Sequence, residues 1–394
     1  MWSVCLAGAC LILIFWVIAG YPLALSKLPA RRPQSALAAV FEPSITAVIP
    51  VHNGAAFLAA KLDSVLASDW PPEKLDVLVL SDGSTDSTDA IAESYARTGR
   101  VRFQRLPRGG KAAALNQALA LTDRSVLVMT DVRQRLERDC IPRLVARLRD
   151  PEVAVVSGNL LIMAGKNDEE ANIGLYWKYE SWIRSRLSRH DSLLGATGPI
   201  YAIRREVARP LPPNCLLDDV WLPMQAVLKG FRSVWEEAAV VWDYPTALRT
   251  EFNRKVRTQA GIYQLLWQEP RLLRPVNRLW WHFVSYKLGR LFLPHMLLTL
   301  LVTSFWLPAA TRGAALTGQI AFYGLAALDM VLASENPLKR LTGPARAIVS
   351  LLAAAFCAQA IFFVPPARLW KVTYALAGPT TASAPAKSRG HAAP

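Results

Sequence analysis

The segment from Val77 to Asp86 most constrains the fold of this chain. Four apolar residues, Val77 to Leu80, are followed by a polar turn that contains Asp82 and Gly83. Such a run predicts a buried parallel strand, and Thr85 or Ser87 can cap a helix that begins near Thr88. Ligands of open α/β sheets bind just beyond the carboxyl ends of the strands. Asp82 is therefore placed to accept a hydrogen bond from a nucleotide base or ribose, although a capped turn without a ligand explains this segment alone equally well.

The same alternation of strand and helix extends over residues 44–268. Strands are expected at 45–51, 77–80, 101–104, 126–129 and 153–158, and helices at 55–67, 87–97, 110–121, 141–148 and 176–182. This pattern predicts an α/β domain with a Rossmann-like, mostly parallel and doubly wound sheet. The carboxyl ends of parallel strands meet at one edge, so Asp82 and Asp131 are expected in one crevice.

Long apolar runs flank this domain. Residues 1–26 carry no charge, exceed the roughly 20 residues that a membrane helix needs, and lack the basic start and cleavage site of a signal peptide. Residues 291–367 hold two further uncharged runs, 291–311 and 347–367. The apolar segment 313–334 between them is a third span or a re-entrant segment. Residues 271–290 predict an interfacial helix, and 378–394 a disordered tail.

The charge of the chain predicts how it is oriented. Lys+Arg total 45 against 30 Asp+Glu, and many of the basic residues flank residues 1–26 and the run that begins at 291. The positive-inside rule therefore predicts a multi-pass protein of the inner (plasma) membrane with residues 44–268 in the cytoplasm. The remaining charge suits anionic lipid or a diphosphate, and nucleic acid is not an expected partner because no nucleic-acid motif is present. If all three C-terminal runs crossed the membrane, the basic tail from Arg368 onward would lie outside, against the same rule.

Three acidic sites share one chemical logic. Asp82 and Asp131 each follow a strand, and Asp218-Asp219 lies between apolar residues. Buried acids are costly unless they are paired, bound to metal or used in chemistry. One carboxylate of the pair is a candidate general base, and Asp131 is a candidate ligand for a divalent cation on a nucleotide diphosphate. Helix capping is the structural alternative for Asp131 and for the pair.

Lys111 is a candidate phosphate contact in the segment Arg108-Gly109-Gly110-Lys111. The segment is not a P-loop, because Ala112 stands where that motif requires Ser or Thr. A solvated basic loop is the alternative.

Together these pieces resemble family 2 glycosyltransferases of the GT-A fold, specifically the membrane-bound relatives of cellulose, chitin and hyaluronan synthases. The resemblance covers residues 44–268, and the flanking apolar runs match the layout of that family. The resemblance rests on the order and spacing of seven segments. They are Val48-Ile49-Pro50-Val51-His52-Asn53, Ser81 to Asp86, Gly110 to Asn116, Thr130-Asp131-Val132-Arg133, Gly195 to Arg205, Asp218-Asp219 and Arg254-Lys255-Val256-Arg257-Thr258.

The resemblance implies a role for each matching position. Asp82 would bind the base or ribose of a UDP-sugar in a pocket lined by Pro50, His52 and Asn53, with Lys111 near the diphosphate. Asp131 matches the first Asp of the DxD motif, which binds Mg²⁺ or Mn²⁺. Asp219 matches the general base, with Asp218 beside it. Gly198 would lie along the acceptor site, and Arg254 and Arg257 match the first and fourth positions of QxxRW.

Three departures from the family pattern are present. Arg133 replaces the second Asp of DxD, so metal binding rests on Asp131 and the diphosphate. Asp218 replaces the Glu of the Glu-Asp pair, which keeps the base. Arg254 replaces Gln and Thr258 replaces the Trp of QxxRW, which weakens the case for a long homopolymer.

The expected function is that of an inverting glycosyltransferase. It would move a sugar from a nucleotide-sugar to a growing polysaccharide or a lipid-linked acceptor in the synthesis of exopolysaccharide or another cell-surface glycan, with export proteins as further candidate partners. The alternative within enzymes is transfer of a single sugar to a polyprenyl phosphate or a lipid-linked oligosaccharide. A catalytically inactive, nucleotide-binding membrane scaffold is the alternative that Arg133 motivates.

Overall fold

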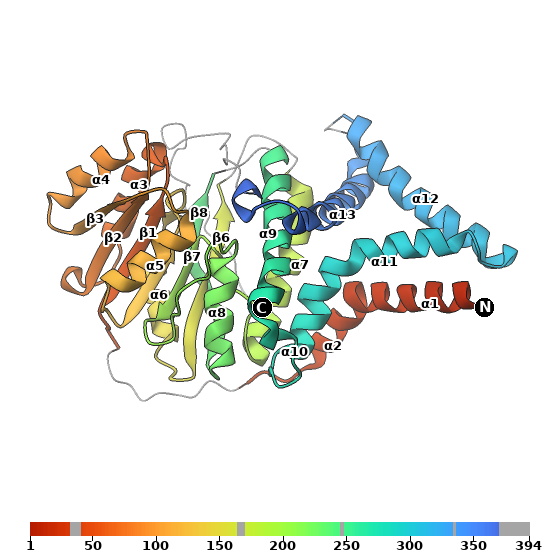
Figure 1. The fold of residues 1–394 in the computed structure, drawn as a ribbon, viewed down its shortest axis with the longest axis horizontal. Helices are drawn as coiled ribbons and strands as arrows, with labels where there is room; N and C mark the ends of the chain where they lie inside the picture. Colours follow the sequence, from red (N-terminus) through yellow and green to blue (C-terminus); the bar gives the residue numbers. More distant parts are fainter. Residues whose placement is uncertain (32–40, 164–169, 245–247, 334–335, 370–394) are drawn as a thin grey trace.

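An eight-stranded sheet forms the centre of the molecule (Figure 1). The computed structural model describes residues 1–31, 41–163, 170–244, 248–333 and 336–369, so the expected disordered tail lies outside the described residues. The strands run in the order β3-β2-β1-β4-β7-β6-β8-β5. Their bounds are β1 Ile45–Val51, β2 Leu75–Asp82, β3 Val101–Leu106, β4 Val126–Thr130, β5 Arg135–Leu136, β6 Val153–Ile162, β7 Ile200–Arg204 and β8 Arg232–Asp243.

The sheet is mixed, which sharpens the prediction of a mostly parallel one. β3, β2, β1 and β4 are parallel, as are β6 and β8, but β7 is antiparallel to both β4 and β6, and β5 to β8. The strand–helix alternation in the sequence did not predict β5, β7 or β8. Because Thr130 at the end of β4 pairs with Ile200 at the start of β7, the loop before β7 reaches the edge of the sheet where Asp131 lies.

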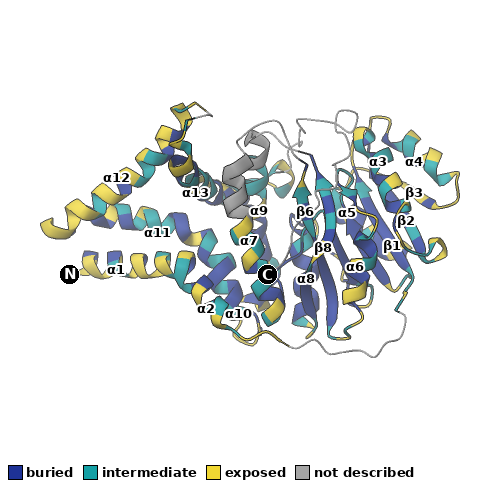
Figure 2. Cartoon of the chain, turned by 180° about the vertical axis from the view of Figure 1, so that it is seen from behind, coloured by how far each residue is buried: buried dark blue, intermediate teal, exposed yellow. Residues whose placement is uncertain are grey.

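Helices cover both faces of the sheet, as predicted for a doubly wound domain. One core layer joins the sheet to α3 Ala55–Leu66, α4 Thr88–Ala96 and α6 Cys140–Arg147. The other joins it to α5 Lys111–Leu121, α7 Glu170–His190, α8 Asp218–Leu228 and α9 Leu248–Gln268. Neighbouring strand residues alternate between the two layers, with Val48 in the second and Ile49 in the first, as expected for pleated strands. Figure 2 shows the buried residues concentrated along the strands.

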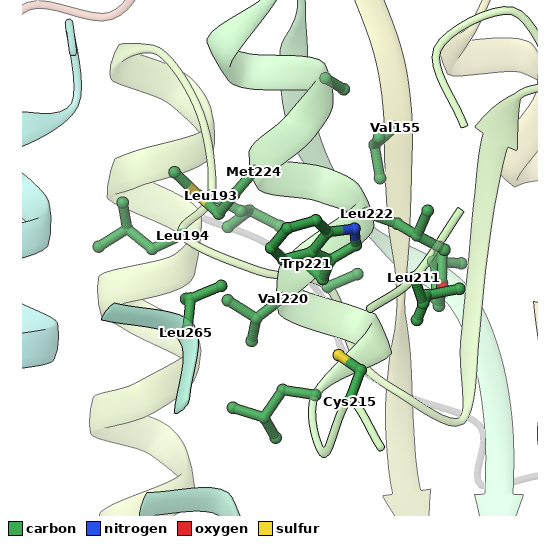
Figure 3. Packing of buried hydrophobic residues seen from close by; sticks show 14 of the residues in the cluster. Val155, Leu193, Leu194, Leu211, Cys215, Val220, Trp221, Leu222, Met224 and Leu265 are labelled. Carbon is green, nitrogen blue, oxygen red and sulfur yellow. The ribbon is translucent and has the colours of Figure 1, made fainter. Parts of the chain in front are cut away.

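Packing around α8 fixes the helix whose first turn holds the acid pair. Val220, Trp221 and Leu222 are buried within the second core layer. Figure 3 shows Trp221 among side chains that include Leu193 and Leu265 of neighbouring segments. The apolar body of α8 is thus held inside the domain, and its amino end is held at the edge of the sheet.

The apolar helices extend away from this domain (Figure 1). α1 Trp2–Phe15, the π-helical turn Trp16–Gly20 and α2 Tyr21–Lys27 form one helical run beside α11 Gly289–Ser304. At their far ends the Ser3 hydroxyl donates to the carbonyl of Trp306 over 2.9 Å. Among the described residues, three helical stretches are long and apolar enough to cross a membrane: Trp2–Lys27, Ala309–Val331 (α12) and Lys339–Phe362, which comprises α13 Lys339–Cys357 and the 3₁₀ turn Ala358–Phe362.

The chain returns to the α/β domain after α12. Near the end of α12, Asp329 accepts hydrogen bonds from Thr342 (2.7 Å) and Arg346 (3.1 Å) of α13. The other end of this run is buried against the domain, because Ala358 and Ile361 belong to its second core layer. The short turn Pro366–Leu369 also contacts α9.

The expected interfacial helix over residues 271–290 is only partly helical. A short 3₁₀ turn covers Pro270–Leu273. The three-residue helix α10, Trp280–His282, leads through the π-helical segment Phe283–Leu288 into α11. A separate 3₁₀ turn, Pro72–Lys74, precedes β2. The break has a local cause: Arg274 precedes Pro275, which disfavours helical backbone at the preceding residue, and Arg274 has an extended ψ of 139°.

Candidate active site

The carboxylate of Asp82 organises the loop before α5. It accepts hydrogen bonds from the backbone N–H groups of Gly109 (2.6 Å) and Gly110 (3.0 Å), and it pairs with the Arg108 guanidinium. Gly110 has a φ of +84°, a conformation that glycine adopts without strain. The side chain of Asp82 is only 5% exposed. Its hydrogen bonds therefore hold the loop that delivers Lys111, and a contact of Asp82 with base or ribose stays a prediction.

The ends of β1 and β2 are joined by hydrogen bonds. Nδ1 of His52 lies 2.8 Å from the backbone oxygen of Asp82, and Oδ1 of Asn53 accepts from the N–H of Thr85 over 2.8 Å. Pro50 lies opposite Leu80 in the parallel ladder. The structure thus brings together Pro50, His52, Asn53 and Asp82, the four residues expected to line a nucleotide pocket.

The expected cap of α4 was wrong. The Ser87 side chain makes no capping bond. Instead the N–H and the hydroxyl of Thr88 both donate to Oδ1 of Asp86, so the residue before Ser87 satisfies a donor of the first turn.

Lys111 joins two of the acidic sites. Its ammonium nitrogen lies 2.9 Å from Oδ1 of Asp131 and 3.0 Å from Oδ1 of Asp218. Burial alone would lower the pKa of Lys111, but Asp131 and Asp218 raise it above its usual value. Burial alone would likewise raise the pKa of Asp131, but Lys111 lowers it. Lys111 is thus a fixed cation, and Asp131 a fixed anion, at the carboxyl edge of the sheet.

Asp219 lies beside this ion-pair network in the first turn of α8. Burial and the neighbouring Asp218 carboxylate raise the pKa of Asp219 to about 6. A Cβ at Gly198 would lie 2.9 Å from Oδ2 of Asp219, so glycine lets the loop before β7 approach this carboxylate without displacing it. The N–H of Ala196 donates to the backbone oxygen of Asp219 over 2.6 Å. Gly198 and the candidate base Asp219 therefore lie next to each other, and a role of Gly198 at the acceptor site stays a prediction.

Arg184 fixes the same loop and was not anticipated from the sequence. Its guanidinium donates to the hydroxyls of Ser157 (2.7 Å) and Thr197 (2.8 Å). The residue lies on α7, two residues beyond the aromatic helix expected over 176–182, so no pattern identified it.

Lys61 is a second residue that sequence reasoning missed. Its buried ammonium donates to the Thr130 hydroxyl (2.6 Å) and to the Gln134 carbonyl (2.7 Å). Burial lowers the pKa of Lys61 to about 7, although the negative charge of Asp131 opposes the shift. A signal existed, since Lys61 interrupts the apolar face that Leu58 and Leu62 share in α3.

Arg133 forms an ion pair with Asp243. Its guanidinium forms two hydrogen bonds with the Asp243 carboxylate at the end of β8, with Nε to Oδ1 at 2.7 Å and Nη2 to Oδ2 at 2.5 Å. The departure from DxD therefore builds an internal ion pair and leaves Asp131 in the network with Lys111. This geometry gives no support to the idea that Arg133 disables the site.

A divalent cation fits this site only together with a ligand. The described residues contain no cluster of three His, Cys, Asp or Glu side chains suited to a metal. Asp131 supplies one carboxylate whose side chain is 37% exposed. Mg²⁺ is commonly held by one or two carboxylates together with substrate phosphates, and Asp131 fits that arrangement.

Further cations approach the carboxylates from α9 and from the segment before α11. Burial and Arg254 lower the pKa of Arg257, while Asp131 and Asp219 act in the opposite direction. Lys287 also lies close enough to lower the pKa of Asp219. The sequence had placed Arg254 and Arg257 near the site, but it had assigned Lys287 only to the basic membrane flank.

Comparison with known proteins identifies the domain. Residues 46–211 match the family described as "Glycosyl transferase family 2". An N-acetylglucosaminyltransferase of Azorhizobium caulinodans is 27% identical over 243 residues, which are 56% of this chain and 60% of the relative. One of Rhizobium meliloti is 24% identical over 256 residues, 60% of this chain and 59% of the relative. The matched regions thus span about three fifths of these curated relatives.

A solved structure shares the fold. The mannosyltransferase of Pyrobaculum calidifontis, in complex with GDP-Man and Mn²⁺, superposes with a TM-score of 0.65 at 20% identity, covering 90% of this chain and 97% of its own. The predicted resemblance and fold class are confirmed. Residues 46–211 of this chain form a glycosyl transferase family 2 domain, built on the GT-A fold.

Proposed function

We propose that the protein is an inverting glycosyltransferase that moves a sugar from a nucleotide-sugar to a hydroxyl of a lipid-linked or growing saccharide. The observation that supports this most directly is the network at the carboxyl edge of the sheet. Lys111 contacts both Asp131 and Asp218 within 3.0 Å, and Asp219 follows directly. A fixed cation for a diphosphate, a carboxylate for a metal and a candidate base lie in one place.

In this proposal Asp219 is the general base. It takes the proton of the acceptor hydroxyl while the hydroxyl oxygen bonds to the anomeric carbon. The bond from that carbon to the diphosphate oxygen breaks on the opposite face, and its electron pair leaves with the diphosphate. A pKa of about 6 keeps Asp219 ionised at neutral pH and still basic enough to accept a proton.

Positive charge at the same edge would stabilise the leaving diphosphate. Lys111 and Arg257 are the side chains we assign to this role, since both act electrostatically on Asp131 and the acid pair. When bound, Mg²⁺ or Mn²⁺ on Asp131 would neutralise charge on the diphosphate oxygens. The Mn²⁺ in the Pyrobaculum mannosyltransferase complex supports a divalent ion as the cofactor class.

The donor and the cellular setting belong to the same proposal. The Pyrobaculum protein is in complex with GDP-Man, and the curated relatives are named N-acetylglucosaminyltransferases. We propose a UDP-sugar as donor, with UDP-N-acetylglucosamine the first to test. The apolar helices support a multi-pass protein of the inner membrane with its catalytic domain in the cytoplasm, acting in cell-surface polysaccharide synthesis together with export proteins.

The experiment measures donor turnover by the purified full-length protein. UDP-N-acetylglucosamine, UDP-glucose and GDP-mannose are each supplied with Mn²⁺ and membrane lipids, and release of nucleoside diphosphate is followed. We expect one donor to be consumed and Asp219→Asn to lower turnover by about 10³-fold while donor affinity is kept. Asp123→Asn, a change of the same kind outside the site, is the control. Wild-type turnover by Asp219→Asn would refute the assignment.

Transfer of a single sugar is a second candidate, favoured by Thr258. This residue stands where QxxRW has Trp, and its hydroxyl donates to the Arg254 carbonyl of its own helix over 2.9 Å. It therefore offers no aromatic ring on which an acceptor sugar can stack. Sizing the labelled product separates the candidates: a ladder of products contradicts single transfer, and one added sugar contradicts polymerisation.

A further inference from the structure

Lys61 is hydrogen-bonded on both sides of Asp131. It lies in α3, a helix of the first core layer, and its side chain is fully buried. The ammonium group donates to the hydroxyl of Thr130 over 2.6 Å and to the carbonyl of Gln134 over 2.7 Å. A buried charge is costly unless it is paired or hydrogen-bonded, so this amine is held in place by the two groups that it contacts. Lys61 thus spans the turn that carries the candidate metal ligand.

The hydrogen bonds of Thr130 have a fixed direction. An ammonium group can only donate and a carbonyl can only accept. Lys61 therefore donates to the Thr130 oxygen, and the proton of this hydroxyl is left to donate to the carbonyl of Pro199 over 2.8 Å. Pro199 directly follows Gly198, the neighbour of Asp219. These two hydrogen bonds, the Thr130 relay, connect α3 with the loop that faces the proposed base.

The Thr130 relay lies where the pairing of two strands ends. The backbone ladder between β4 and β7 ends with the pair of Thr130 and Ile200. Asp131 on one strand and Pro199 on the other lie just beyond this pair, and the Thr130 side chain reaches across to the Pro199 carbonyl. Side-chain hydrogen bonds therefore continue the connection between the proposed metal ligand and the loop before β7 beyond the last backbone pair.

Ser64 of the same helix holds a different part of this segment. Its hydroxyl donates to the carbonyl of Lys61 over 2.8 Å and accepts a hydrogen bond from the N–H of Leu136 in β5 over 3.2 Å. Ser64 therefore anchors β5, two residues beyond Gln134, and lies outside the relay. Removal of the Ser64 hydroxyl shows what the loss of another α3 contact does, whereas removal of the Thr130 hydroxyl breaks the relay itself.

We propose that Lys61 is a positioning residue, which keeps Asp131 and the loop beside Asp219 at a fixed spacing through the Thr130 relay. The inference rests on the proposed function, in which the donor diphosphate lies at Asp131 and the acceptor hydroxyl at Asp219. An in-line displacement needs both reactants aligned, and a misplacement of about 1 Å can cost about 100-fold in rate. Lys61 touches neither reactant in this proposal and acts through the two segments that hold them.

The first test needs neither substrate nor metal. Amide hydrogen exchange of the full-length protein in detergent micelles is compared for the wild type, Lys61→Met, Thr130→Val and Ser64→Ala. We expect Lys61→Met to speed exchange by about tenfold in residues 131–134 and in residues 195–198, because each segment loses a hydrogen bond or its support. Thr130→Val should speed exchange in residues 195–198 by a similar factor, and it keeps the proposal testable if Lys61→Met does not fold.

Ser64→Ala is the matched control and should leave both segments at the wild-type rate of exchange. Wild-type exchange of residues 195–198 in Thr130→Val would overturn the proposal. Equal acceleration of these residues by Ser64→Ala and Thr130→Val would overturn it as well, since any weakened contact of α3 would then have the same effect.

Steady-state kinetics separate positioning from a general loss of stability. Thr130→Val should lower kcat by about tenfold or more and change the donor KM by less than about twofold, because alignment is lost while the groups that bind the donor remain. Lys61→Met should lower kcat in the same way and also raise the Mn²⁺ concentration needed for half-maximal turnover. A kcat equal to that of the wild type in both variants, per folded protein, would overturn the positioning role.

The two measurements separate this inference from the function on which it rests. Donor turnover by the wild-type protein, together with wild-type exchange in Lys61→Met and Thr130→Val, would overturn the relay alone. Exchange that changes as expected, without turnover of any donor, would instead contradict the glycosyltransferase proposal and with it the purpose of the relay in catalysis.

Discussion

Asp82 is the last residue of β2 and Asp131 directly follows β4, two strands of the parallel part of the sheet, and their side chains have different partners. The side chain of Asp82 is 5% exposed and bonded to two backbone N–H groups and to Arg108. That of Asp131 is 37% exposed and is paired with a side chain, the ammonium group of Lys111. Backbone donors are committed to their acceptor, whereas an ammonium group can shift toward an incoming phosphate. Asp82 is thus suited to hold a loop, and Asp131 to meet a ligand.

The largest effect is expected at Asp131. Asp131→Asn removes the charge that we assign to the metal, and it should lower turnover by about 10³-fold with little loss of folding stability. Steady-state release of nucleoside diphosphate, measured across a Mn²⁺ titration, checks this. A variant whose metal requirement matches that of the wild type would show that the two strand ends do not differ in the proposed way.

A large effect on folding rather than chemistry is expected at Arg133. Arg133→Ala leaves the Asp243 carboxylate buried without its ion-pair partner, which should lower the free energy of unfolding by about 3 kcal/mol. Denaturation of the detergent-solubilised protein measures this. Arg138→Ala is the control, since its pair with Asp69 is exposed and should contribute less than about 1 kcal/mol. Equal losses of unfolding free energy would mean that the buried pair of Arg133 and Asp243 stabilises the fold no more than the exposed pair does.

An intermediate effect is expected at Asp82. Asp82→Asn turns an amide toward the N–H groups of Gly109 and Gly110, so the loop that carries Lys111 should loosen. We expect the donor KM to rise by about tenfold or more and hydrogen exchange of residues 108–110 to speed up. Asp76→Asn on the same strand, whose partner Arg102 lies at the surface, is the control. Weaker donor binding with unchanged exchange would favour a direct contact with the nucleotide.

The smallest effect concerns pH. A base must be ionised, so kcat/KM should fall as the pH drops through about 6, the pKa of Asp219. Burial is the larger cause of that raised pKa and Asp218 the second. Asp218→Asn should therefore move the acid limb to lower pH by about one unit or less. A pH profile of the variant that coincides with the wild type would assign the limb to another group.

The sequence predicted the strands and helices that alternate along the chain, and the site residues that belong to short local motifs. Strand–helix alternation predicted β1 to β4 and β6 with their helices, because apolar runs and turn residues are local signals. β7 escaped prediction, since its antiparallel direction depends on partners in β4 and β6 that lie far away in the chain. Strand ends that meet at one edge predicted Asp82 and Asp131 in one crevice, whereas only the family resemblance implied that Lys111 and the acid pair of Asp218 and Asp219 belong to the same site.

The remaining site residues could not be read from local pattern. Lys61 contacts Thr130, which lies 69 residues further along the chain, and Arg184 contacts Thr197, which lies 13 residues further. A lysine in a helix ordinarily faces solvent, so neither contact is evident from the local sequence. Arg133 was interpreted through a motif, but its partner Asp243 lies 110 residues further on. Such pairings depend on tertiary packing, so only the folded chain reveals them.

The placement of α13 sets the number of bilayer crossings. Its amino end is bonded to Asp329 at the end of α12, and its carboxyl end is buried against the catalytic domain. If α1, α11 and α12 each cross a membrane, then the stretch Lys339–Phe362, although long and apolar enough to cross one, starts and finishes on the face that holds the α/β domain. The count is then three rather than four. An odd count leaves Arg368 on the same face as Lys27, which removes the conflict with the positive-inside rule.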